Sequence, residues 1–236
     1  MTILKYCRKF VNKFLEKINY IRHSIIETIF VLLDSRFLIK KNDKVLFLDL
    51  GANIGQGYSW FSKFFKGENI DFELFEPNPY CYKKLKNYVN IKNKAVITHN
   101  LGVSTISGKV KFYGLKEEGD IYSLSGSIVK NHNSIHYKTK EENAIEIETI
   151  NLGELLIEKS KTHNKLIIKM DIEGAEVEIL EKLISTEIAN LIDILYVEFH
   201  SQYQVKSEHA RILKVREKKI IKSLKKFKNL HLRLWH

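Results

Sequence analysis

Ionisable side chains gather near the ends of two apolar segments in the second half of the chain. The first, KLIIKMDIEGAEVEILEKL at 165–183, has the pattern of a buried strand that turns into a helix with early acidic residues. The second, LIDILYVEFH at 191–200, is largely apolar until its end. The residues concerned are Lys169, Asp171, Glu173, Glu198 and His200. Because charges there are costly to bury without partners, this crowding is more typical of a functional site than of packing.

Two kinds of chemistry suit these residue types. Imidazole titrates near neutral pH, so His200 is the preferred general base, with Asp171 and its neighbours as the alternative proton acceptors. The rival hypothesis assigns a divalent cation, Mg²⁺ or another, to Asp171, Glu173, Glu198 and His200, since carboxylates suit hard metal ions. Lys169 is expected either to stabilise developing negative charge or to pair with Asp171. For each residue the plain alternative is a structural ion pair at the rim of the sheet.

A glycine-containing turn provides a second candidate site. The stretch VLFLDLGANIGQG at 45–57 has the pattern of a strand ending in Asp49, a tight turn and the start of a helix near Tyr58. In an open α/β sheet, a ligand binds outside the carboxyl end of such a strand, where the helix offers free N–H groups. The order GxxxGxG is neither the GxGxxG of a dinucleotide site nor a Walker loop, which needs GK[ST]. An ordinary βα turn is the alternative.

An acidic residue ends the next predicted strand. The segment DFELFEPNP has the pattern of a strand at 71–75 that ends at Glu76 and is stopped by two prolines. An acid in this position, one strand after a glycine turn, is well placed to accept hydrogen bonds from a ribose diol. A surface glutamate before a turn is the alternative. A third strand is predicted at 94–100, after a basic helix at 79–90.

The rest of the chain yields further structural expectations. Residues 101–114 are expected to form a turn and an added hairpin strand that reverses at Gly108. Residues 115–143 lack periodicity, and their hydroxyl groups together with Tyr122, His132 and His136 are equally consistent with an acceptor pocket and with a solvated loop. A strand at 144–150 precedes a helix with Asn151 as its cap.

Composition indicates one α/β domain with extensions. The chain has 236 residues, of which 44% are hydrophobic and 11% aromatic. Its only two cysteines, Cys7 and Cys81, have no metal-type partner nearby, which favours a reducing compartment and a cytoplasmic location. The division expected is an N-terminal helical extension at 1–44 and a main domain at 45–236.

The two ends of the chain carry its positive charge. Residues 1–44 contain ten basic and four acidic residues, and residues 205–236 contain eleven basic and two acidic residues. The stretch between them is mildly acidic. Such ends suit nucleic acid or an anionic membrane surface, although a general lysine bias with solvated side chains is the preferred explanation. The apolar run at 29–33 is too short to span a bilayer and no cleavage site follows it, so residues 1–40 are expected to form a helix that lies at a membrane interface or packs on the core.

Four motifs together carry a family resemblance. The combination DLGANIG, FEPNP, KMDIEGAE and EFH resembles the FkbM family of S-adenosylmethionine (SAM)-dependent methyltransferases, over about residues 45–203. The resemblance implies a Rossmann-like class I methyltransferase fold, with a central, mostly parallel sheet and helices on both faces. It also implies SAM as cofactor and assigns the cofactor site to Asp49, Gly51, Asn53, Gly55, Glu76, Asn100, Leu101 and Asp171. By this resemblance, Asp49, Gly51, Asn53 and Gly55 surround the methionine end of SAM, and Glu76 binds the ribose. The stretch at 99–101 contacts the adenine.

The resemblance also implies an activity. Family members mostly methylate hydroxyls of sugars, so an O-methyltransferase acting on a sugar or glycoconjugate hydroxyl is expected, with His200, Asp171, Lys169 and Glu198 as catalytic residues. One alternative is a nucleic-acid methyltransferase that uses the basic helix at 206–228, although the chain lacks the (N/D)PP(Y/F) tetrapeptide. Another is a non-catalytic module that docks at a membrane through its basic termini.

Overall fold

The computed structural model describes residues 24–92, 96–115, 126–130, 132, 139–203 and 207–235. The chain divides into two compact units, Met1–Lys40 with His236 and Lys41–Trp235. In the first unit, residues 24–33 form an α-helix that continues as the π-helix η1 (Asp34–Leu38). Its exposed apolar side chains are Ile25, Ile26, Ile29, Phe30, Leu33 and Phe37. Residues 24–38 are therefore helical, as predicted, whereas residues 1–23 of the predicted helical segment lie outside the described residues. The role of this segment at a membrane or on the core stays a prediction.

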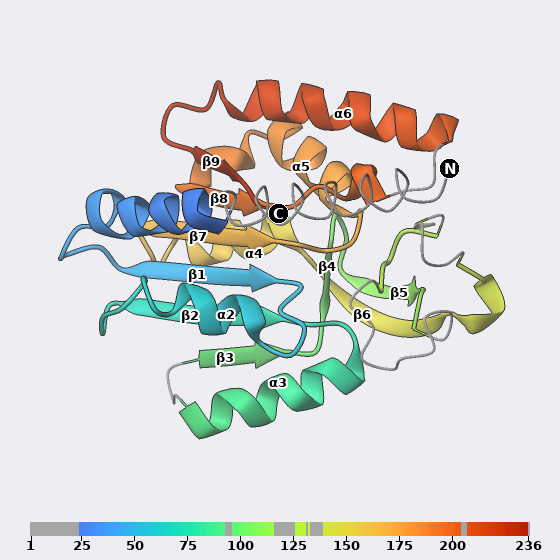
Figure 1. Cartoon of the computed structure of the whole chain (residues 1–236), viewed down its shortest axis with the longest axis horizontal. Helices are drawn as coiled ribbons and strands as arrows, with labels where there is room; N and C mark the ends of the chain where they lie inside the picture. The colour runs from blue at the N-terminus through green and yellow to red at the C-terminus, as the bar shows by residue number, and fades with distance from the viewer. Residues whose placement is uncertain are drawn as a thin grey trace, which may run out of the picture. The chain divides into compact units, whose positions relative to one another are not determined.

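A six-stranded sheet forms the centre of the second unit, in the order β3-β2-β1-β7-β8-β9 (Figure 1). Every neighbouring pair in it is parallel. The strands are β1 (Val45–Leu50), β2 (Ile70–Phe75), β3 (Val96–His99), β7 (Lys165–Met170), β8 (Ile194–Val197) and β9 (His231–Leu234). The order reverses between β1 and β7, and open α/β sheets form their ligand crevice at such a point.

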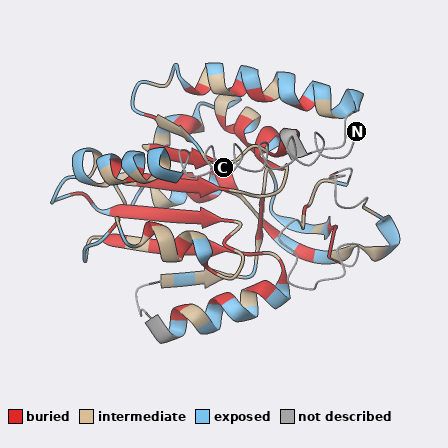
Figure 2. Cartoon of the chain, viewed as in Figure 1, coloured by how far each residue is buried: buried red, intermediate tan, exposed pale blue. Residues whose placement is uncertain are grey.

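Helices cover both faces of this sheet, as predicted. On one face, leucines and isoleucines of β1 and β7 form a single core with α4 (Leu152–Lys159), α5 (Glu176–Ser185) and α6 (Glu208–Leu224). On the other face, Phe47 of β1 contacts Phe61 of α2 (Gln56–Phe61), whose Tyr58 in turn contacts Tyr88 of α3 (Pro79–Lys92). Figure 2 shows the central strands buried throughout. The fold is an α/β, Rossmann-like, doubly wound sheet.

A smaller sheet corrects one prediction. It contains β4 (Gly102–Ser104), β6 (Ile145–Asn151) and β5 (Gly108–Phe112), in the order β4-β6-β5. The predicted hairpin is wrong, because β4 and β5 do not pair with each other. Strand β6 lies between them, parallel to β4 and antiparallel to β5, and the Thr149 hydroxyl donates to the carbonyls of Ile106 and Gly108. Local sequence could not reveal a partner strand about 40 residues away.

Other boundaries differ little from expectation. The helix predicted to start near Tyr58 is α2, which begins at Gln56, and the basic helix predicted at 206–228 is α6. Asn151 caps α4 as predicted, because its side chain accepts from the N–H groups of Gly153 and Glu154. The strand-like C-terminal segment is β9, which ends the sheet in the described part of the chain. No helix among the described residues is sufficiently long and apolar to span a bilayer.

Candidate active site

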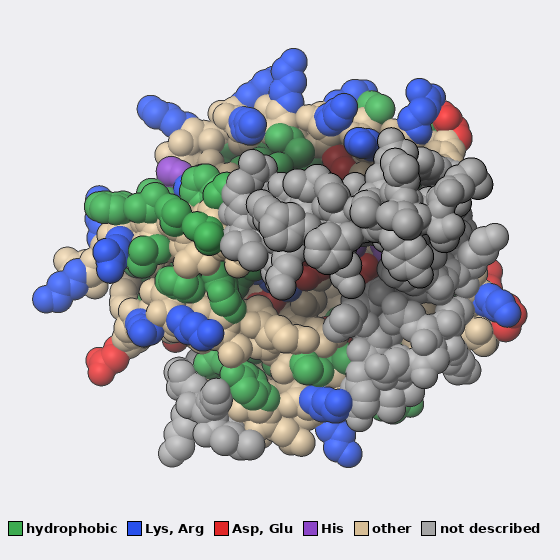
Figure 3. Space-filling view, viewed as in Figure 1, with side chains coloured by type: hydrophobic (Ala, Val, Ile, Leu, Met, Phe, Trp, Pro, Cys, Tyr) green, Lys and Arg blue, Asp and Glu red, His purple; other side chains and the backbone are tan. Residues whose placement is uncertain are grey.

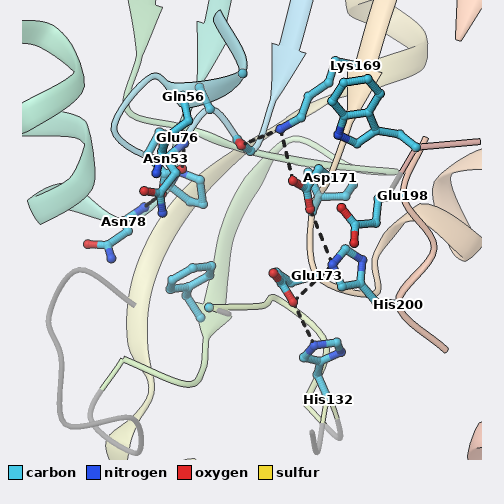
Figure 4. A pocket seen from close by; sticks show the side chains of 18 of the residues that line it. Asn53, Gln56, Glu76, Asn78, His132, Lys169, Asp171, Glu173, Glu198 and His200 are labelled. Carbon is cyan, nitrogen blue, oxygen red and sulfur yellow. Dashed lines mark hydrogen bonds and ion pairs between the residues drawn. The ribbon is translucent and has the colours of Figure 1, made fainter. Parts of the chain in front are cut away.

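A cavity of about 620 Å³ lies at the carboxyl ends of β1, β2, β7 and β8 (Figure 4). This size falls within the usual range for small-molecule sites. Figure 4 shows Asn53, Gln56 and Glu76 on one side of it and Asp171, Glu198 and His200 on the other. Both predicted candidate sites therefore meet in one cavity, because parallel strands bring their carboxyl ends to the same edge.

The turn after β1 is held close to the turn after β7. Gly51 has φ +79°, and a Cβ atom at this position would lie 1.8 Å from the carbonyl oxygen of Asp171, so only glycine fits. Asn53 also adopts a left-handed conformation, with φ +48°, which asparagine tolerates better than most residues. Gly55, with φ +100°, lies against Leu85 of α3 and is not among the residues that line the cavity.

Glu76 forms the polar wall on the β2 side. Its two carboxylate oxygens accept hydrogen bonds from the backbone N–H groups of Asn53 and Asn78, each at 2.7 Å. The side chain is nearly fully buried, and this burial raises its pKa to about 7, against the lowering effect of those two hydrogen bonds. A carboxyl group fixed in this way has lone pairs left for the hydroxyl groups of a ligand.

Lys169 connects the two sides of the cavity. Its Nζ donates to the carbonyl of Gly51 at 3.0 Å and lies 3.2 Å from Asp49 Oδ1 and 3.3 Å from Asp171 Oδ2. Burial pulls the pKa of Lys169 down, but the attraction of Asp171 and Asp49 outweighs it and leaves the pKa above its usual value. The predicted pairing with Asp171 is therefore present in the structure.

Asp49 lies beneath the cavity. It is fully buried, and its Oδ1 forms an ion pair with Lys169 Nζ at 3.2 Å. The pKa of Asp49 is raised by burial, partly offset by Lys169. The Asp49 carboxylate lies close to the backbone of Gly57, where an added Cβ atom would be only 2.9 Å from Asp49 Oδ2. Asp49 thus has acceptor capacity next to the turn that lines the cavity.

His200 is surrounded by carboxylates. Its Nδ1 lies 2.9 Å from Glu176 Oε1, and its Nε2 lies 3.4 Å from both Asp171 Oδ1 and Glu173 Oε2. Burial lowers the pKa of His200, but the charges of Glu176 and Glu173 outweigh this effect and raise it well above 6.5. The surrounding carboxylates therefore favour the protonated form of the imidazole.

Glu173 ties a distant segment to this cluster. It has φ +56°, and its Oε2 lies 3.2 Å from Nε2 of His132, which is a buried residue of the irregular region. Its carbonyl also accepts a hydrogen bond of 2.6 Å from the Ser127 hydroxyl. Burial alone would raise the pKa of Glu173, yet hydrogen bonds from His132 and His200 lower it to about 2. Gly126 and His132 thus form part of the cavity wall.

Three of the four predicted metal ligands come together. One oxygen each of Asp171 and Glu198 and one ring nitrogen of His200 lie within 4.8 Å of one another. Glu173, the fourth predicted ligand, is not in this group, since its carboxylate is bonded to the two histidines. A histidine and two carboxylates of this kind suit either proton transfer or binding of a hard divalent cation.

Most predicted site residues line the cavity, but some do not. Those that do are Gly51, Asn53, Glu76, Lys169, Asp171, Glu173, Glu198 and His200. Neither Asn100 nor Leu101 does. The Asn100 amide instead donates to the backbone carbonyls of Glu76 and Pro77, and Leu101 packs against the main core. Asn100 thus supports the corner that carries Glu76.

Several lining residues escaped the sequence analysis. They are Gln56, Gly57, Trp60, Pro77, Asn78, Phe112, Gly126 and Trp235, besides Ala52 and Ile172. Asn78 lies within the FEPNP motif, which was a usable signal. Trp235 and Phe112 carried none, because they reach the cavity through β9 and β5, whose positions depend on non-local pairing. His132, named as a candidate, lines the cavity, whereas Tyr122 and His136 lie outside the described residues.

Comparison with known proteins shows what this chain is similar to. A curated relative, hexuronic acid methyltransferase AglP from Haloferax volcanii, is 27% identical over 161 residues, which cover 68% of this chain and 58% of that protein. This chain therefore spans little more than half of that relative's length. A crystal structure of methyltransferase FkbM from Methylobacillus flagellatus KT has 17% sequence identity and a TM-score of 0.39, covering 67% of this chain and 34% of that one. The model of the methyltransferase FkbM domain matches residues 49–219, so this chain belongs to the FkbM methyltransferase family.

Proposed function

We propose that this chain transfers the methyl group of SAM to a hydroxyl group of a sugar or glycoconjugate, with residues 45–236 as the catalytic domain. The observation that carries the proposal is the single cavity with two chemically different walls, which Lys169 connects. One wall, around Glu76, suits a hydroxyl-bearing cofactor. The other, around Asp171 and His200, suits removal of a proton from an acceptor.

The residues on the β1–β2 side fit SAM. When bound, SAM supplies a methyl group activated by its sulfonium. Glu76 offers fixed carboxylate oxygens to the ribose diol. The turn at Gly51 and Asn53 brings the backbone to the cavity, and the buried Asp49 carboxylate, which pairs with Lys169 through Oδ1, keeps further lone pairs beneath the turn. Both features suit the amino group of the methionine end. The adenine position is assigned to the Pro77–Asn78 corner, which lines the cavity where Asn100 and Leu101 do not.

The opposite wall suits a polar acceptor of sugar type. Carboxylates of Asp171 and Glu198 can accept hydrogen bonds from neighbouring hydroxyls, while Phe112 and Trp235 offer apolar surface to a ring. The name of the relative from Haloferax volcanii supports a sugar as acceptor. The exact sugar is not part of the proposal.

The proposed general base is His200, acting from its neutral form. Glu176 accepts from Nδ1, so the lone pair of the neutral ring is on Nε2, which faces Asp171 on the cavity wall. Nε2 takes the proton of the acceptor hydroxyl as the oxygen becomes the nucleophile. Asp171 and Lys169 hold the acceptor in line with the methyl group, and such alignment supplies much of the rate enhancement in a displacement of this kind.

A divalent cation held by Asp171, Glu198 and His200 is the alternative route to an activated hydroxyl. In that arrangement the contact from His200 to Glu176 would orient the ligating ring, as carboxylates commonly do for metal-bound histidines. Turnover that survives dialysis against EDTA supports the base. Turnover that EDTA abolishes and Mg²⁺ restores supports the cation.

Analysis of the methylated product tests the proposal. The purified chain would be incubated with SAM carrying a labelled methyl group and with a panel of hexuronic acid-containing and neutral glycans. The expected product is an alkali-stable methyl ether, formed by the wild type and not by His200→Ala. A methyl ester released by mild alkali would contradict a hydroxyl acceptor, and labelling of RNA or DNA in preference to glycans would contradict the sugar.

A further inference from the structure

The outward side of α6 is almost uniformly basic. Its buried positions, Leu213, Glu217, Ile220 and Leu224, recur at helical spacing and face the protein. The exposed lysines on the remaining side and in the turn that follows are Lys214, Lys218, Lys219, Lys222, Lys225, Lys226 and Lys228, which we call the lysine face. Figure 3 shows blue side chains along the edge that α6 occupies in Figure 1.

Few acidic groups neutralise this face. Glu208 pairs with Arg211, and Glu181 of α5 pairs with Arg216 and also attracts Lys219. Glu217 points inward, where its oxygens accept from the N–H and hydroxyl of Ser201. No lysine of the face has a carboxylate within ion-pair distance among the described residues, and the attraction between Glu181 and Lys219 acts over a longer distance. Concentrated positive charge of this kind attracts a polyanionic surface.

Two apolar side chains lie among the lysines. Ile212 and Val215 are 47% and 46% exposed, and they are three residues apart on the outer side of α6. Lysines around exposed aliphatic groups are typical of helices that lie on a bilayer, because the aliphatic groups enter the interface while the ammonium groups remain at the phosphates. Single-stranded nucleic acid is bound instead on aromatic platforms, and α6 contains no Phe, Tyr or Trp.

We propose that the lysine face docks this protein on the surface of an anionic lipid bilayer. This inference goes beyond the proposed methyl transfer and does not depend on it. The interactions of Ser201 with Glu217 tie α6 directly to the segment that carries His200, so docking would hold the cavity close to the bilayer. An acceptor attached to a lipid would then be presented at a high local concentration.

Vesicle sedimentation of the full chain tests the proposal. We expect the protein to sediment with phosphatidylcholine vesicles that contain 30% phosphatidylglycerol, not with pure phosphatidylcholine, and to be released at high salt because exposed charges are screened. Each lysine near an anionic surface strengthens binding about fivefold. The triple variant Lys218→Glu, Lys222→Glu, Lys226→Glu should therefore weaken binding by at least about a hundredfold.

A matched variant separates this face from overall charge. Lys63→Glu, Lys83→Glu, Lys86→Glu changes three exposed lysines near α2 and on α3, with the same change in net charge. The control variant should retain most vesicle binding, and both variants should keep the melting temperature of the wild type. Equal sedimentation of the α6 variant and the wild type would overturn the proposal. So would absence of vesicle binding by the wild type, or a clear preference for RNA over vesicles.

Discussion

Glu176 holds His200 by one ring nitrogen, so that the other nitrogen faces the cavity wall. The Oε1 atom of Glu176 lies 2.9 Å from His200 Nδ1 and also accepts from the N–H of Ile172, while Oε2 accepts from the N–H of Gly174. The side chain is completely buried. One carboxylate thus fixes both the β7–α5 turn, which carries Asp171, and the imidazole from the segment after β8.

Replacement of Glu176 by Gln should impair turnover without affecting SAM binding. In the wild type, both carboxylate oxygens of Glu176 accept from N–H groups. The amide NH2 group of glutamine would replace one of these oxygens and face an N–H donor, so His200 would lose its fixed orientation. We expect a 10- to 100-fold fall in kcat, as when comparable supporting residues are lost, and a loss of stability of about 1–3 kcal/mol. Calorimetry with SAM, steady-state kinetics and thermal melts provide the measurements. Glu178→Gln, on the exposed side of α5, is the control, and an unchanged kcat in Glu176→Gln would refute the positioning role.

Replacement of His200 by Ala should abolish turnover while SAM affinity stays within about threefold. Loss of a general base typically costs 10²- to 10⁴-fold in rate. His163→Ala is a suitable control, because His163 contacts Asp71 at the opposite end of the strands. Single-turnover rates with saturating SAM would measure the chemical step. If His200→Ala kept normal rates, His200 would be eliminated as the base.

SAM affinity should depend on pH through Glu76. Burial raises the pKa of this carboxyl to about 7 in the free protein, so below pH 7 the group is protonated. Because the ribose hydroxyls donate to the ionised Glu76 carboxylate, SAM binding below pH 7 must release the proton of Glu76. We expect affinity to fall by up to about tenfold per pH unit below 7 and to level off above it. Calorimetry at pH 6 in buffers of different ionisation enthalpy measures the released proton. Buffer-independent heats at pH 6 would contradict the linkage.

A pair of glycine substitutions should separate close packing from backbone strain. In Gly51→Ala the new Cβ would overlap the Asp171 carbonyl, so β1 and β7 must shift at the cavity. We expect loss of SAM binding and destabilisation of more than about 4 kcal/mol. Gly108→Ala has φ +136° but no atom within 4 Å of the new Cβ, so it should cost only about 1–3 kcal/mol of strain. Chemical denaturation and SAM titration would show the difference, and intact SAM binding in Gly51→Ala would argue against this turn as the cofactor site.

The sequence predicted the central sheet because its middle strands, β1 and β7, are buried on both faces. Apolar runs such as 45–50 and 165–170 have few other interpretations when turn residues and helical patterns follow them. Their polar ends then predicted which side chains would meet, since carboxyl ends of parallel strands share one edge. Asp171, Glu198 and His200 are close together for this reason.

The sequence could not predict contacts that depend on distant pairing. Ser127 and His132 meet Glu173 of the β7–α5 turn over separations of 46 and 41 residues. Trp235 lines the cavity because β9 pairs with β8. The raised pKa of His200 likewise follows from Glu176 and Glu173, whose distance from the ring no local pattern encodes.

The most direct test of the central claim is calorimetric titration of the purified protein with SAM and with its demethylated product. The account predicts that both bind to the wild type and that Glu76→Ala abolishes binding, because the fixed ribose acceptor is lost. Glu73 is a buried glutamate of β2 that contacts Lys159 and His99. The folded Glu73→Gln variant should bind SAM with normal affinity. Absence of binding by the folded wild type, or full affinity in Glu76→Ala, would contradict the proposed cofactor site.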